Sequence, residues 1–151
     1  MNKTDHPPLL AAGIHTLTLA EFEQVTVTPF PADAGRRRLF LLFEQWIVKL
    51  QALDISATLW VDGSFVTSKH GPDDIDCTMW DPTFRGGQTP ERERKAAPLI
   101  DRVLLKSQQG LDLYIETPSL GRRLTRESMW RGLYGFQHDR KSAKGFVELT
   151  I

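Results

Sequence analysis

The sequence is poor in cysteine, since Cys77 is the single one among 151 residues. One thiol excludes a disulfide within the chain and a zinc site built from several cysteines. Cys77 follows Asp76 on a predicted strand, and neighbouring side chains of a strand point to opposite faces. We therefore interpret Cys77 as a small buried hydrophobe and not as a nucleophile.

Long apolar runs are also missing, and none approaches the ~20 residues that a membrane-spanning helix needs. We therefore expect no membrane partner. The opening residues MNKTDHPP lack the apolar core of a signal peptide, which indicates a cytoplasmic protein. A chain of this length is expected to form a single domain, residues 1–151, with an extended and flexible lead-in over residues 1–13.

Net charge is absent as well, but the two parts of the chain differ. Residues 1–90 carry 7 Lys/Arg against 11 Asp/Glu, and residues 91–151 carry 12 against 8. A neutral total argues against non-specific nucleic-acid binding as the main activity. The asymmetry still allows a basic wall beside an acidic site.

Signals for helices and strands alternate along the chain. A capping box at Thr18 predicts a helix over residues 19–25, and Asp33 is placed to cap a long helix. Further along we predict strands over 57–61 and 111–116, with a strand between them that carries residues 74–76. We also predict a helix from Thr89 that is interrupted at Pro98 and ends near Gly110, a short helix over 125–131, and a β-hairpin of residues 133–138 with 146–151. This order favours an α+β fold, with a mixed sheet, helices packed mainly on one face and a C-terminal hairpin.

Two carboxylates share one patch of the second predicted strand. Asp74 and Asp76 flank Ile75, so they project on the same side of the strand while Ile75 turns into the core. Like charges this close raise each other's proton affinity, and a bound cation keeps both ionised. Mg²⁺ is the natural ion, because it binds one or two protein carboxylates and keeps positions for water and phosphate.

The turn before this strand contains Gly63 and Ser64. Glycine lets a phosphate approach the backbone, and the serine hydroxyl and nearby amides donate hydrogen bonds to its oxygens. Another acid, Asp112, lies inside the later apolar run LDLYI, and Glu116 follows that run. Asp62 precedes the glycine as a turn-former, and we leave it outside the metal set.

Together these residues resemble the nucleotidyltransferase superfamily that includes polymerase β. Its signature is an apolar strand, Gly-Ser, roughly ten residues, Asp-x-Asp within a strand, and a third acid on a later strand. The block from Asp62 to Asp76 is similar to one in small bacterial domains of that superfamily, and to the minimal nucleotidyltransferases of toxin–antitoxin and phage-defence loci. One departure is Phe65-Val66-Thr67, which stands where an arginine commonly follows Gly-Ser.

The resemblance implies an Mg²⁺- or Mn²⁺-dependent enzyme that moves a nucleoside monophosphate from an NTP to a hydroxyl on a macromolecule, either tRNA or a protein. Asp74, Asp76 and Asp112 would be its metal ligands and catalytic residues, with Asp112 as base or as the group that orients the acceptor. Glu116 is the rival for the place of the third acid. A partner protein or a homodimer would help to hold the acceptor, because little of the chain remains for a separate acceptor-binding domain. The alternative is a nucleotide-sensing or partner-binding module of the same fold, and a third possibility is an interaction domain with coincidental acids.

Basic and aromatic residues complete the set of candidates. We expect Lys69, Arg122 and Arg126 to join Gly63 and Ser64 in nucleotide binding, although each cation could equally be solvated surface charge. Arg36, Arg37 and Arg38 are similarly open between a solvated helix face and a phosphate or partner contact, and His70 between a loop residue and a ligand. Nearby aromatic side chains could stack a nucleobase or belong to the core: Trp130, Tyr134 and Phe136.

Overall fold

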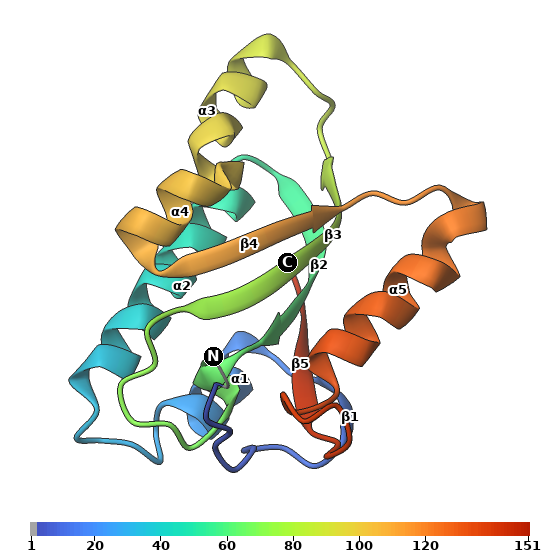
Figure 1. Ribbon diagram of the computed structural model, residues 1–151. Helices are drawn as coiled ribbons and strands as arrows, with labels where there is room; N and C mark the ends of the chain where they lie inside the picture. Colours follow the sequence, from blue (N-terminus) through green and yellow to red (C-terminus); the bar gives the residue numbers. More distant parts are fainter. Residues whose placement is uncertain (1–2) are drawn as a thin grey trace.

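The computed structural model describes residues 3–151, and the chain has an α+β fold (Figure 1). Over this range the strands are β1 (Gly13–Thr16), β2 (Ile55–Asp62), β3 (Ile75–Phe84), β4 (Leu111–Glu116) and β5 (Gly145–Thr150). They form one five-stranded mixed sheet in the order β1-β5-β2-β3-β4. Strand β2 is antiparallel to β3 and β5, whereas β4 runs parallel to β3 and β1 runs parallel to β5.

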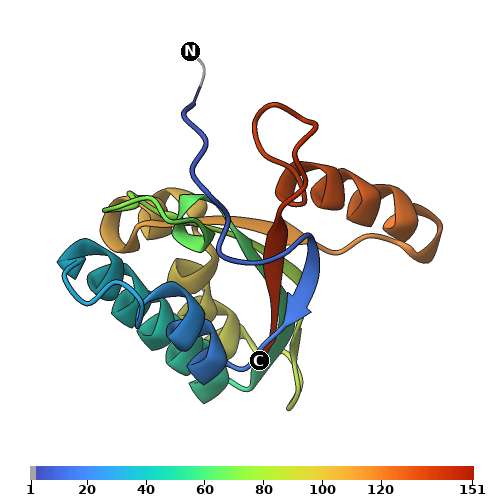
Figure 2. The ribbon, with the colours of Figure 1, turned by 90° about the horizontal axis from the view of Figure 1, so that it is seen from below.

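Five α-helices lie within the same residues: α1 (Leu19–Thr26), α2 (Ala34–Ala52), α3 (Pro90–Ile100), α4 (Arg102–Gln109) and α5 (Leu120–Tyr134). Figures 1 and 2 show α1 to α4 on one face of the sheet and α5 on the other. The prediction that helices pack mainly on one face is confirmed. Of the helices in the described range, none has the length and apolar character needed to cross a membrane.

The larger core fills the space between the sheet and helices α1 to α4. Phe22, Phe43 and Trp46 are fully buried there against strand residues such as Leu59 and Met79. Cys77 is also completely buried on this face, as predicted, and burial raises the pKa of its thiol. The thiol is therefore protonated and inert at neutral pH.

A smaller aromatic core lies under α5, because alternate residues of each strand face that side. Its members are buried and stack in tilted and edge-on pairs: Trp60, Trp80, Trp130, Tyr134 and Phe146. The Tyr134 hydroxyl lies 2.9 Å from the Thr78 hydroxyl of β3. The helix is therefore anchored to the sheet at its C-terminal end.

Local capping signals set most of the helix ends. Thr18 forms a capping box with Glu21, and the Asp33 carboxylate accepts a hydrogen bond from the Arg36 amide at the start of α2. Gly110 closes α4 in the left-handed conformation with φ of +61°. Pro98 stays inside α3, and the interruption falls at Asp101, which caps α4 through the Leu104 amide.

The predicted C-terminal hairpin is wrong. Residues through Tyr134 continue α5, which begins at Leu120 and not near residue 125, and only the bridge between Phe136 and Ala143 has a hairpin arrangement. Strand β5 instead pairs with β1 and β2. A one-turn extension of a helix cannot be distinguished from a short strand when its residues are aromatic and apolar, so the pairing partner decided the outcome.

The lead-in is more ordered than we predicted. Residues 1 and 2 lie outside the described range, but Pro8 bridges Thr67, and β1 begins at Gly13 within the predicted lead-in. The Leu9 amide donates to the Val66 carbonyl at 3.0 Å, and the Ser68 amide donates to the Pro7 carbonyl at 2.9 Å. Residues 3–9 are called the N-terminal segment.

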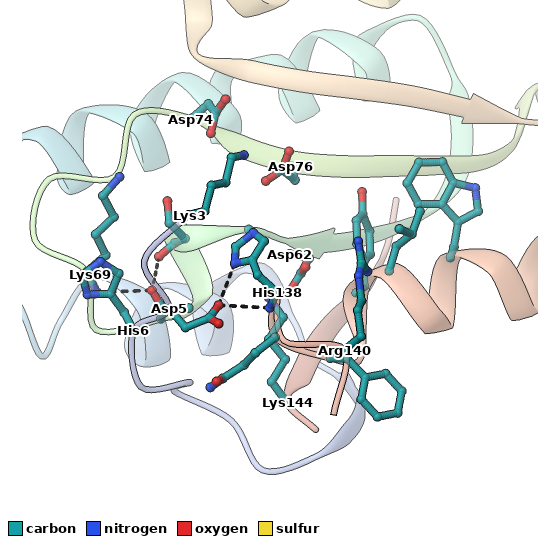
Figure 3. Close-up of a pocket in the computed structure, with 18 of the residues that line it drawn as sticks. Lys3, Asp5, His6, Asp62, Lys69, Asp74, Asp76, His138, Arg140 and Lys144 are labelled. Carbon is teal, nitrogen blue, oxygen red and sulfur yellow. Dashed lines mark hydrogen bonds and ion pairs between the residues drawn. The ribbon is translucent and has the colours of Figure 1, made fainter. Parts of the chain in front are cut away.

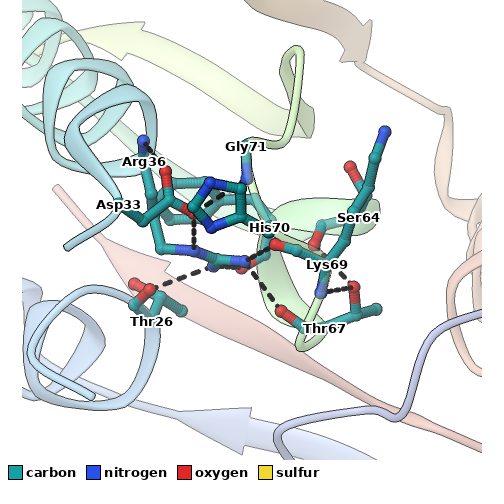
Figure 4. A network of polar contacts seen from close by, with 9 residues as sticks. Thr26, Asp33, Arg36, Ser64, Thr67, Lys69, His70 and Gly71 are labelled. Carbon is teal, nitrogen blue, oxygen red and sulfur yellow. Dashed lines mark hydrogen bonds and ion pairs between the residues drawn. The ribbon is translucent and has the colours of Figure 1, made fainter. Parts of the chain in front are cut away.

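Arg36 is fully buried, which corrects both interpretations of it as a solvated or phosphate-binding residue. Its guanidinium donates to four backbone carbonyls, at 3.0 Å to Thr26, 2.5 Å to Phe65, 2.9 Å to Thr67 and 2.6 Å to Lys69 (Figure 4). Its Nε lies 3.5 Å from the Asp33 carboxylate. Arg36 therefore fixes the loop after Ser64 against the first turn of α2.

Candidate active site

Three acids form a row across neighbouring strands. The register pairs Asp62 of β2 with Asp76 of β3, and Asp76 with Asp112 of β4. All three lie on the α5 face of the sheet, since they share the parity of Trp60 and Trp80. Asp74 stands one residue before β3. The strands thus bring Asp74, Asp76 and Asp112 to the same end of the sheet. Asp62, which we did not predict as a metal ligand, lies there too.

The turn at Gly63 is shaped around Asp76. Gly63 has φ of +84° and ψ of −167°, a conformation that is essentially restricted to glycine. A Cβ at this position would overlap the Asp76 Oδ2 atom and lie 3.0 Å from its Cγ. The missing side chain therefore provides the space that the Asp76 carboxylate occupies, beside the 3-10 turn Ser64–Val66.

Asp112 is bound on both oxygens by cations from α4. Arg102 Nε lies 2.7 Å from Oδ1, and Lys106 Nζ lies 2.9 Å from Oδ2. Although burial opposes ionisation, these hydrogen bonds and charges hold the pKa of Asp112 below its ordinary value. A carboxylate held in this way is a weak base. Lys106 Nζ also lies 3.7 Å from the Asp74 carboxylate.

Burial has the opposite effect on the other two acids of the row. It raises the pKa of Asp62 to about 7, even though Lys144 Nζ lies 2.9 Å from its Oδ1. Burial and the charges of Asp74 and Asp112 raise the pKa of Asp76 to about 6. Desolvated carboxylates that repel each other are the environment in which a bound cation stabilises the ionised form.

The carboxylates of Asp74 and Asp76 decide whether a metal ion fits here. Within residues 3–151, no group of three or more His, Cys, Asp or Glu side chains lies close enough to hold a metal together. Asp74 and Asp76 provide two hard oxygen donors with no arginine or lysine within hydrogen-bond distance in this range. Two carboxylates suffice for Mg²⁺ when water and phosphate supply the remaining ligands, so this pair fits the ion.

A cavity of about 990 Å³ lies over the acids (Figure 3). Its floor contains Asp62, Asp74 and Asp76, and one wall is formed by the turn with Gly63 and Ser64. The opposite wall is the C-terminal half of α5 with the loop of residues 135–144. The predicted residues Lys69 and Arg126 also line it, whereas Asp112 and Arg122 do not.

The predicted phosphate-binding cations differ in their surroundings. Lys69 Nζ lies 3.1 Å from the Asp73 carboxylate, whose side chain is 87% exposed, so this ion pair is weak. Arg126 instead forms an ion pair with Glu116, whose Oε1 also accepts from Trp130 Nε1 at 2.8 Å. Glu116 is thereby committed to α5 and not to the acid row.

The three aromatic candidates also separate. Trp130 and Tyr134 are buried in the aromatic core, and Phe136 is 39% exposed and lines the cavity. Exposed Met129 and Leu133 lie on the same wall. Trp130 and Tyr134 also border the cavity, but Phe136 is the most exposed of the three aromatic residues that we considered for base stacking.

Sequence reasoning missed two segments that border the cavity. The N-terminal segment contributes Lys3 and Asp5. Figure 3 shows Lys3 directed toward Asp74 and Asp76, and its positive charge partly offsets the burial that raises the pKa of Asp76. Asp5 Oδ1 accepts from the His138 amide at 3.1 Å and lies 2.6 Å from its Nδ1.

The second segment is the 135–144 loop, which brings Arg140 and Lys144 to the cavity.

The sequence contained a signal for part of the site. Asp62 lies on a strand at an even-numbered position like Trp60, so its face could have been assigned by alternation. The contacts of the basic loop and of Arg102 and Lys106 had no comparable local signal, because they depend on where α4 and α5 pack.

No curated protein and no solved structure matches the chain significantly. Residues 2–150 match the family of unknown function DUF6932 over nearly the full length of the chain. The row of acids, the glycine turn and the cavity over them therefore lie in a chain that belongs to the DUF6932 family.

Proposed function

We propose that this protein is an Mg²⁺-dependent nucleotidyltransferase, which moves a nucleoside monophosphate from an NTP to a macromolecular hydroxyl and releases pyrophosphate. The observation that carries the proposal is the Asp74 and Asp76 pair beside Gly63, at the floor of a cavity large enough for a nucleotide. Ligand sites of about 300–1,000 Å³ are typical of small-molecule pockets.

The lining of the cavity is divided in a way that suits an NTP. Acids occupy the floor, and Lys69, Arg140 and Lys144 stand around it. Apolar side chains lie on the α5 wall, with Phe136 among them. A triphosphate would meet the cations, and a base would meet the apolar wall.

The chain's own residues would act mainly by positioning. Asp74 and Asp76 would hold Mg²⁺, which when bound supplies charge neutralisation at the reacting phosphate. Ser64 and the amides of its turn would donate hydrogen bonds to phosphate oxygens, and Gly63 leaves the room that the Asp76 carboxylate needs. Phosphoryl transfer requires little covalent chemistry from the protein, so residues that position the metal ion and the phosphates are the kind that the reaction needs.

The test is thermal unfolding with each NTP, with and without Mg²⁺, for wild type and Asp74→Asn/Asp76→Asn. A ligand that binds only the native state stabilises it by about 2.7 kcal/mol at 100 times Kd. We expect the unfolding temperature of the wild type to rise with at least one NTP when Mg²⁺ is present, and we expect the double variant to lose this rise. Asp54→Asn is the matched control, because Asp54 is an exposed acid that does not line the cavity. Wild type without any such rise would overturn the proposal.

The acceptor would be tRNA or a protein, in a toxin–antitoxin or phage-defence setting. The sheet, its helices and the connecting loops use nearly the whole described chain, which supports an acceptor held by a partner protein or a second copy. Transfer of α-³²P from the stabilising NTP into tRNA or protein, separated on a gel, identifies the class. Label in neither fraction, with the partner protein present, would contradict transfer.

A nucleotide-sensing module of the same fold is the second candidate. The engagement of both Asp112 oxygens by Arg102 and Lys106 favours it, because such an acid is a weak base. Asp112→Asn discriminates between the two. It should abolish turnover and spare nucleotide binding in an enzyme, and in a sensor there is no turnover to lose.

A further inference from the structure

Two cations of α4, Arg102 and Lys106, bind Asp112, the acid that would be the third metal ligand. Arg102 and Lys106 lie four residues apart, so they project from the same face of the helix. Both reach Asp112, whose side chain is 8% exposed, and they occupy its two oxygens. Lys106 Nζ then stands between two acids, 2.9 Å from Asp112 and 3.7 Å from Asp74.

Further contacts hold the cations of α4 in place. Arg102 donates to the Tyr114 hydroxyl at 2.5 Å, and its guanidinium lies 4.1 Å from the centre of that ring. Asp101 caps α4, and Gly110 ends it next to β4. Because α4 lies on the opposite face of the sheet, both side chains reach around the edge strand β4 to the face from which Asp112 projects.

From these contacts we infer that the proposed site takes one divalent ion and not two, and that Lys106 is the fixed cation that fills the second position. This inference rests on the proposed function. A second ion would need a carboxylate oxygen of Asp112, and Lys106 already holds the one that faces Asp74.

The arrangement also gives Lys106 a role toward the ligand. Its ammonium is half exposed and lies beside the Asp74 carboxylate. A phosphate bound next to Asp74 would therefore find a fixed positive charge on its Asp112 side, without any second ion. Lys106 is therefore a positioning residue for the Asp74 carboxylate and a positive charge that can face the phosphate of the substrate.

The experiment counts Mn²⁺ ions on the full chain by electron paramagnetic resonance and isothermal titration calorimetry, without nucleotide. Lys106→Met removes the ammonium and keeps most of the side-chain length. We expect one Mn²⁺ in wild type and two in Lys106→Met, whose first ion also binds up to about fivefold more tightly, as an exposed charge at this range allows. Lys95→Met is the control, because Lys95 pairs with Glu91 on α3, away from the acids, and it should leave one ion.

A third variant separates exclusion of an ion from general disturbance. Lys106→Met/Asp112→Asn has neither the lysine nor the freed carboxylate, and it should return to one ion while unfolding cooperatively. Two ions in wild type, or one ion in Lys106→Met, would overturn the role of Lys106 and leave the proposed function standing. No Mn²⁺ on wild type would overturn both, and loss of the single ion in Asp74→Asn/Asp76→Asn would support the site itself.

Discussion

Gly63 offers the sharpest test of the site geometry, through the substitution Gly63→Ala. Its φ of +84° with ψ of −167° costs about 1–3 kcal/mol for a residue with a side chain. The added Cβ would also overlap Asp76 Oδ2 and stand 3.0 Å from Cγ, closer than the ~3.5 Å of a comfortable carbon contact. The carboxylate of Asp76 must therefore move away from the turn.

The consequence for function follows from that displacement. A shift on the order of 1 Å at a reacting centre costs about 100-fold in rate. We expect Gly63→Ala to lose about 1–3 kcal/mol of unfolding free energy, from the backbone strain, together with the Mn²⁺-dependent stabilisation. Urea unfolding with and without Mn²⁺ measures both quantities on the same samples.

Gly71→Ala is the matched control for this substitution. Gly71 also has a positive φ, +59°, but a Cβ there would have no atom within 4 Å. It should cost about 1–2 kcal/mol from backbone strain and keep the Mn²⁺-dependent rise. The reasoning is refuted if Gly63→Ala retains the full rise, or if Gly71→Ala loses it to the same extent.

Three further predictions concern the supports of the site. Arg36→Met should lower the unfolding free energy by about 3–5 kcal/mol, because it leaves four carbonyls without their donor and the buried Asp33 carboxylate without its cation. Arg37→Met, on the exposed face, should cost less than about 1 kcal/mol in the same urea titration. Burial opposes ionisation of Asp33, but hydrogen bonds from backbone amides and nearby positive charges hold its pKa below the ordinary 3.8. The unfolded state then binds more protons in acid, so the contribution of Asp33 is present above about pH 5 and is lost as the pH falls below it, and Asp33→Asn should flatten that part of the pH profile of stability. Asp5→Ala removes the contacts with His138 and should speed hydrogen exchange in the N-terminal segment without changing the main unfolding transition.

Each of these has an outcome that would contradict it. Equal losses for Arg36→Met and Arg37→Met would show that the buried network contributes no more than a surface pair. An unchanged acid slope in Asp33→Asn would place the pH dependence elsewhere. Unchanged exchange in Asp5→Ala would show that the backbone bonds at Pro7 and Leu9 hold the segment by themselves.

The sequence by itself determined the elements whose signals are local. The capping box at Thr18 and the caps at Asp33 and Gly110 set helix ends, because a side chain within a few residues satisfies the free backbone groups. Alternation on the strands placed Asp76 and Cys77 on opposite faces, and the order of elements gave the α+β class. The same alternation predicted the shared face of Asp74 and Asp76, whereas the place of Asp112 beside them was implied by the resemblance and is set by the pairing of β3 with β4.

Tertiary structure decided what depends on residues far apart in the chain. Strand β5 pairs with β1 and β2 because those edges are available in the folded sheet, which a hairpin signal over residues 133–151 cannot reveal. Arg36 is buried because the loop after Ser64 brings its carbonyls to the start of α2. Both oxygens of Asp112 are bound by cations because α4 packs next to β4, and this packing leaves neither oxygen free for a metal ion.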